Sequence, residues 1–208
     1  MAELDHILWA APDLDRGAQA FAALTGVEAV KGGSHPGFGT RNFLSSFGNG
    51  HYFEIISPDP EQSLEGNRGG HIASLPHPGL ITFALRASDL DGVRRAAQSV
   101  GLVAEEPIHM TRRRPDGVQL EWAILNLRDA ALGDAVPFLI DWKNSPHPAD
   151  TTPGGCRLVS FTALHPESDR LAEIYRAIGC PVPVKRAARP GFLAVLETPR
   201  GEVILTHP

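Results

Sequence analysis

Hydrophobic and polar residues along this chain follow a pattern that recurs three times. In each copy a short apolar run is followed by acidic or hydroxyl residues, then by apolar residues three or four positions apart, and then by a glycine. This order predicts a strand, a capped turn, an amphipathic helix and a helix stop. The predicted helices cover residues 13–24, 89–100 and 167–178.

Short apolar segments bounded by glycine and proline follow each helix and predict further strands. Pro115-Asp116-Gly117 is a hairpin signal between two of them, and the glycine-rich stretches 32–37 and 66–70 are predicted loops. The repeating unit is therefore βαβββ. The predicted strands are 4–10, 27–30, 41–47 and 52–57 in the first copy, 79–87, 102–105, 108–114, 118–127 and 136–142 in the second, and 157–164, 182–186, 192–197 and 202–206 in the third.

Composition and charge exclude several classes of protein. The chain has 208 residues, 42% of them hydrophobic, and a formal net charge of −5 with both signs interspersed. Nucleic-acid binding is not expected because a basic face is missing, and no apolar run approaches the roughly 20 residues of a membrane span. The N-terminus lacks the features of a secretion signal, and two cysteines, Cys156 and Cys180, do not make a disulfide framework. We therefore expect a cytoplasmic protein.

The repeat resembles the vicinal oxygen chelate superfamily and, within it, the glyoxalase-like domain proteins. The resemblance implies an α+β fold in which βαβββ modules form a cupped mixed sheet with a central cleft. We expect residues 1–150 to form a glyoxalase-like domain of two modules, about 1–60 and 78–143, with a third module at 151–208 packed against it. The strings that carry the resemblance are Leu4-Asp5-His6-Ile7 with Pro12-Asp13-Leu14, residues 35–42, 52–56, 113–117 and 137–142.

The resemblance also implies a site for a divalent metal ion such as Fe, Mn, Zn, Ni or Co. In the superfamily the ligands often come from the first and fourth strands of each module, which here match His6, Glu54 and Asp141. Thr82 stands where the second module would carry its histidine, and His77 and His35 are the candidate substitutes. We expect His6 and Glu54 to point into one cleft, and Asp141 to face it too. Strand alternation makes that last expectation a test of register.

Taken by itself, His6 has a simpler interpretation. One histidine on a half-buried strand is more commonly structural, with Asp5 or a backbone carbonyl as its hydrogen-bond partner. The other candidate residues also have structural alternatives: Asn42 can cap its own backbone, and the arginine run at 112–114 is typical of a solvated strand edge. The candidates are Glu54 and Glu121 for catalysis, and His35, Phe38, Thr40, Asn42, Arg113 and Trp122 for substrate binding.

Two functions follow as expectations. The first is a metal-dependent enzyme that acts on a vicinal-oxygen or α-oxo small molecule, with the reaction type (lyase, isomerase or dioxygenase) left open. The alternative is a metal-free protein that binds an apolar small molecule in the same cleft, which the aromatic residues and Thr82 favour. In both cases the partner is a small-molecule ligand, and a homodimer is possible.

Overall fold

The structure is a computed structural model that describes residues 2–113, 117 and 119–208; the side chains of Arg112 and Arg113 are not described. The chain has the predicted α+β fold class and forms two compact units that interleave along the sequence. The first unit comprises the residues up to His6, Thr82–His147 and Thr162–Gly191, and the second unit comprises Ile7–Ile81, Pro148–Phe161 and Phe192–Pro208. Strands β1 (Glu3–Ala10), β5 (Gly79–Arg86) and β11 (Arg157–His165) run from one unit into the other.

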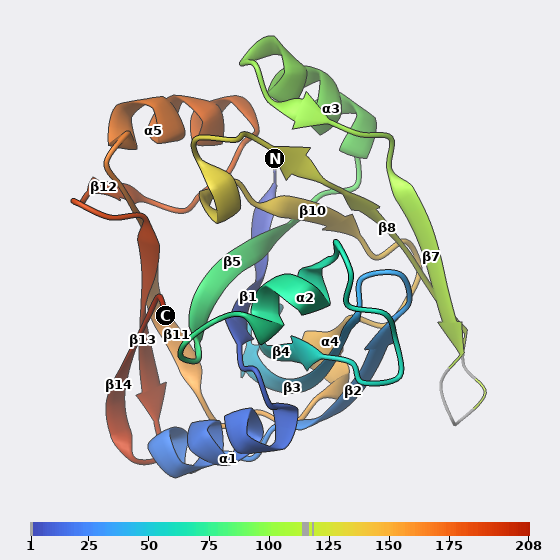
Figure 1. Cartoon of the computed structure of the whole chain (residues 1–208), viewed down its shortest axis with the longest axis vertical. Coiled ribbons are helices and arrows are strands. Elements are labelled where there is room, and N and C mark those ends of the chain that lie inside the picture. Colours follow the sequence, from blue (N-terminus) through green and yellow to red (C-terminus); the bar gives the residue numbers. More distant parts are fainter. Residues whose placement is uncertain (1, 114–116, 118) are drawn as a thin grey trace. The chain divides into compact units, whose positions relative to one another are not determined.

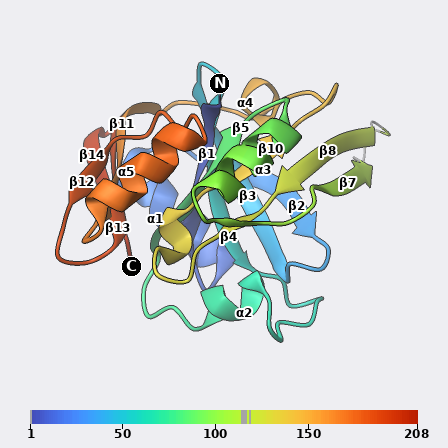
Figure 2. The ribbon, with the colours of Figure 1, turned by 90° about the horizontal axis from the view of Figure 1, so that it is seen from above.

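In the first unit the strand order is β5-β10-β8-β7. Strand β10 pairs in parallel with β5 and antiparallel with β8, and β7 and β8 form a long antiparallel hairpin (Figure 1). Helices α3 (Leu90–Ser99) and α5 (Ser168–Ala177) lie next to each other (Figure 2). The remaining elements are β6 (Val103–Ala104), β7 (Ile108–Arg113), β8 (Gln119–Leu125), β9 (Leu127–Arg128), the 3₁₀ turn Gly133–Ala135, β10 (Phe138–Asp141) and β12 (Val184–Arg186).

In the second unit the strand order is β2-β3-β4-β1, and helix α1 (Leu14–Thr25) packs against β3 and β4. Phe21 of this helix stacks on Phe53 with ring centroids 4.7 Å apart. The helix approaches closely because Gly17 has no side chain: a Cβ there would lie 2.6 Å from that of Ala11. The other elements are β2 (Val30–His35), β3 (Thr40–Gly48), β4 (His51–Pro58), α2 (Arg68–Ala73), α4 (Pro148–Thr151), β13 (Gly191–Thr198) and β14 (Gly201–Thr206).

The three predicted helices are confirmed within one or two residues, and their ends follow the expected chemistry. Asp13 and Asp89 each accept a backbone N–H of the first turn. The third helix differs: Glu167 makes no side-chain cap, and its own N–H donates to Nδ1 of His165. The glycines after the helices have φ angles of 77°, 85° and 70°, at Gly26, Gly101 and Gly179.

Two sequence predictions about loops are wrong. The strand expected at 27–30 lies instead at Val30–His35 and runs into the first glycine-rich stretch, because its backbone groups pair with β3. Helix α2, which Asn67 caps, begins within the second glycine-rich stretch. The predicted hairpin turn Pro115-Asp116-Gly117 falls largely outside the described residues, although β7 and β8 pair on either side of it.

The third copy has the predicted element order, namely β11, α5, β12, β13 and β14. The compact units do not coincide with the predicted domain limits, which remain a prediction. None of the described helices is both long and apolar enough to cross a membrane.

Candidate functional site

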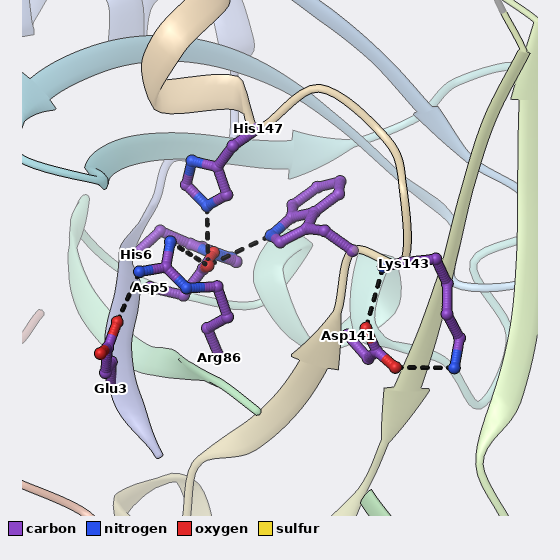
Figure 3. Close-up of polar contacts among 8 residues, drawn as sticks. Glu3, Asp5, His6, Arg86, Asp141, Lys143 and His147 are labelled. Atoms are coloured by element: carbon purple, nitrogen blue, oxygen red, sulfur yellow. Dashed lines mark hydrogen bonds and ion pairs between the residues drawn. The ribbon is translucent and has the colours of Figure 1, made fainter. Parts of the chain in front are cut away.

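A buried carboxylate is the centre of a polar cluster in the first unit. Asp5 of β1 is completely buried. Its Oδ1 lies 2.6 Å from Nδ1 of His6, and its Oδ2 lies 2.8 Å from Nε2 of His147 (Figure 3). The indole N–H of Trp142 donates to the same Oδ2 at 3.1 Å. We call these four residues the Asp5 cluster.

The contacts of Asp5 fix its charge and the tautomer of its neighbour. Burial alone would raise the pKa of Asp5, but the hydrogen bonds and positive partial charges of His147 and His6 outweigh it and hold the pKa well below its usual range. An ionised carboxylate only accepts hydrogen bonds, so Nδ1 of His6 carries a proton, and in the neutral imidazole the lone pair is then on Nε2. A carboxylate that orients a histidine in this way is typical of metal-binding and acid–base histidines.

Two further sets of contacts surround the Asp5 cluster, one from Arg86 and one from Ser145. Arg86 donates to Glu3 at 2.6 Å, and its Nη1 lies 3.9 Å from Oδ2 of Asp5 (Figure 3). The loop that carries His147 is tied to β8, because Ser145 both accepts the N–H of Glu121 and donates to its carbonyl. His147 thus lies on a loop that the Ser145 hydroxyl joins to the backbone of β8.

An apolar face continues from the Asp5 cluster across β10, β8 and β7. The Phe138 ring meets the His6 ring edge to face at 5.7 Å, and the Trp142 and Trp122 rings lie 6.0 Å apart. The face consists of Ala84, Met110, Leu120, Trp122, Ile124, Phe138, Ile140 and Trp142.

Asp141 lies on the other face of β10. Its Oδ2 contacts Nζ of Lys143 at 2.6 Å, and its Oδ1 accepts the backbone N–H of Lys143 (Figure 3). The prediction that Asp141 faces the same side as His6 is therefore wrong. The physical reason is the alternation of side chains along a strand. Phe138 and Trp142 point to the face that contacts His6 and Asp5, so Asp141 points to the opposite face.

A second polar cluster lies in the second unit around Asn42. Its Nδ2 donates to Oε1 of the buried Glu54 at 2.8 Å and lies 3.2 Å from Nε2 of His35. Nδ1 of His35 lies 2.9 Å from the hydroxyl of Thr40. Oδ1 of Asn42 accepts the backbone N–H of Gly33 at 2.8 Å. We call Asn42, Glu54, His35 and Thr40 the Asn42 cluster.

The structure thus brings four of the predicted site residues together in the Asn42 cluster. His6 and Glu54 belong to different units, and their pairing stays a prediction. Glu121 is exposed on the face of β8 opposite Trp122. Phe38 is half-buried in a loop held by a bond from Gly69 to its carbonyl.

The remaining candidates do not complete a metal site. Thr82 is buried and His77 is exposed. The side chain of Arg113 lies outside the described residues. Within the part of the chain that the structure describes, no group of three or more His, Cys, Asp or Glu residues is arranged to hold a metal ion.

Sequence reasoning missed two members of the Asp5 cluster. His147 has no histidine or cysteine partner at a regular spacing, and Trp142 follows an apolar run typical of a core strand. Only the adjacent pair Asp5-His6 was a usable signal, since it already supplies the carboxylate and the imidazole. Residues 142 and 147 reach it through folding alone.

The chain matches the family model described as glyoxalase-like domain over residues 4–179. A hypothetical protein from Staphylococcus aureus has a similar structure, with a TM-score of 0.65 and 16% identity over 99% of this chain and 85% of that one. Methylmalonyl-CoA epimerase from Mycobacterium tuberculosis is 22% identical over 71% of this chain and 91% of its own, with a TM-score of 0.47. The search of curated proteins finds no match.

Proposed function

Because the chain belongs to the glyoxalase-like domain family, we propose that it is an enzyme acting on a vicinal-oxygen or α-oxo small molecule. A divalent ion (Fe, Mn, Zn, Ni or Co) would be bound through His6 and Glu54. The observation that carries the proposal is the 2.6 Å contact between Asp5 and Nδ1 of His6, which directs the lone pair to Nε2.

The two proposed ligands fit such an ion chemically. A neutral imidazole nitrogen and a carboxylate suit these divalent metals, and Asn42 holds the carboxylate of Glu54. A site with two protein ligands would leave coordination positions for two oxygens of a substrate. When bound, the ion would polarise a substrate carbonyl.

The protein's own groups would then handle orientation and proton transfer. Asp5 keeps His6 in one tautomer, and the apolar face beside it excludes water from that side. Glu54 is the proposed base for a proton on the carbon next to the carbonyl, because it is a buried carboxylate. Glu121 is left out of this role because it is exposed.

Metal analysis of the purified, tag-free protein tests the proposal. We expect about one ion per chain in the wild type and a loss of bound metal in His6→Ala. His109→Ala is the matched control, because His109 is an exposed strand histidine. An unchanged metal content in His6→Ala, with the fold intact by circular dichroism, would reject the proposed site.

The apolar face favours a second candidate, a metal-free protein that binds an apolar small molecule. Trp122 and Trp142 lie within this face, so a bound aromatic compound should quench their fluorescence. Saturable quenching in metal-free protein, reduced by Trp122→Ala, would support this candidate over the first. A cytoplasmic location and a homodimer remain predictions from the sequence.

A further inference from the structure

The side-chain amide of Asn42 makes its hydrogen bonds to other groups of the protein. Its Oδ1 accepts the N–H of Gly33, which fixes which end of the amide is oxygen and which is nitrogen. Nδ2 therefore carries both protons toward Oε1 of Glu54 and Nε2 of His35. Three of the amide's hydrogen-bonding positions are occupied in this way.

The glycine pair 32–33 makes this arrangement possible. A Cβ at Gly32 would lie 2.1 Å from Oδ1 of Asn42, so any side chain at this position must displace the amide. The residue has no left-handed φ that would itself require glycine. We therefore conclude that the absence of a side chain at Gly32 leaves the space that the amide of Asn42 occupies.

We infer that Asn42 is a positioning residue. Its amide packs against Gly32, is held by the N–H of Gly33, and keeps the Glu54 carboxylate in one orientation. The inference rests on the proposed function in that the oriented carboxylate is the proposed ligand and base. It replaces the expectation that Asn42 contacts the substrate. The register of β3 and β4 supports it, because Leu44 pairs with Glu54 and Asn42 lies two residues away on the same face.

Two variants test separately the hydrogen-bond donor of Asn42 and the space that its amide occupies, and a third variant is the control. Asn42→Leu keeps the approximate shape of the side chain without adding a charge, but it removes the donor to Glu54. Gly32→Ala leaves Asn42 and Glu54 in the sequence but displaces the amide. Asn144→Ala is the control, because Asn144 is exposed.

Calorimetric titration with Mn²⁺ provides the first measurement. We expect Asn42→Leu and Gly32→Ala each to weaken Mn²⁺ binding roughly 10–100-fold, the usual effect of removing a group that orients a metal ligand. Asn144→Ala should bind like the wild type. If both variants bind within twofold of the wild type while Glu54→Ala loses binding, the inference is overturned and the proposed function stands.

A second measurement does not depend on metal. In the ¹H–¹⁵N spectrum, the side-chain amide of Asn42, identified by its loss in Asn42→Leu, should shift strongly in Gly32→Ala and in Glu54→Gln. If the wild type binds no Mn²⁺ but these shifts occur, the proposed function fails and the positioning of Glu54 is supported. Unchanged shifts in both variants overturn the inference.

Discussion

The Asp5 cluster and the Asn42 cluster are each built around a buried carboxylate, but the two are held in different ways. Asp5 accepts N–H groups from two imidazoles and an indole, with a guanidinium 3.9 Å away. Glu54 accepts a hydrogen bond from the amide of Asn42, and Nε2 of His35 lies 3.8 Å from the same oxygen. The two imidazoles and the indole hold Asp5 as an anion that orients His6, whereas Glu54 is the carboxylate to which we assign the proposed chemistry.

The two clusters should therefore respond differently to substitution, one in the stability of the fold and the other in ligand binding. Changes around Asp5 should alter the free energy of unfolding, because they leave buried N–H groups without an acceptor. Changes around Glu54 should mainly affect ligand binding.

The largest expected effect is that of Asp5→Ala. We expect a loss of about 3–5 kcal/mol in the free energy of unfolding, because the variant leaves the donors of His6, His147 and Trp142 facing an apolar methyl group. Urea unfolding measures the loss. Asp91→Asn, an exposed residue in the first turn of α3, should change stability by less than about 0.5 kcal/mol. Equal effects of the two changes would contradict the comparison.

The pH dependence of stability should show the ionisation of Asp5. Because its pKa is lowered in the folded protein, its contribution is complete above the unfolded pKa of about 3.9 and is lost as the pH falls from there toward the folded pKa. The stability difference between wild type and Asp5→Asn should therefore shrink below about pH 4. A difference that stays constant from pH 6 to pH 3 would show that Asp5 does not carry the predicted charge.

His147→Ala should have an intermediate effect. It removes one donor from Asp5 and so loosens the group that orients His6, which should weaken Mn²⁺ binding roughly 10-fold. His147→Gln keeps a donor close to the position of Nε2 and should recover most of the affinity. If alanine and glutamine behave alike in the titration, His147 only fills space.

The smallest effect is expected at the edge of the Asp5 cluster. Glu3 is 66% exposed and pairs with Arg86 at 2.6 Å, so Glu3→Gln should cost less than about 1 kcal/mol and lose even that in high salt. Thermal unfolding at two salt concentrations checks this. A loss as large as that of Asp5→Ala would mean that Glu3 belongs to the cluster itself.

The sequence alone determined the repeat and most of its elements. The first two helices could be located because an aspartate caps the start of each, and all three helices are followed by a glycine in the left-handed conformation. The strand within the glycine-rich stretch 32–37 could not be found, since its stability comes from pairing with β3. Local preferences of glycine oppose a strand at this position.

Three residues of the Asn42 cluster are close in sequence, and the prediction of the fourth, Glu54, follows from the family resemblance. His35, Thr40 and Asn42 lie within eight residues on the paired strands β2 and β3. The pairing of β3 with β4 brings them to Glu54. Trp142 and His147 reach Asp5 across more than 130 residues, so no local pattern could indicate them. The facing of Asp141 was likewise decided by tertiary structure, because a pleated strand offers two faces and only packing selects the buried one.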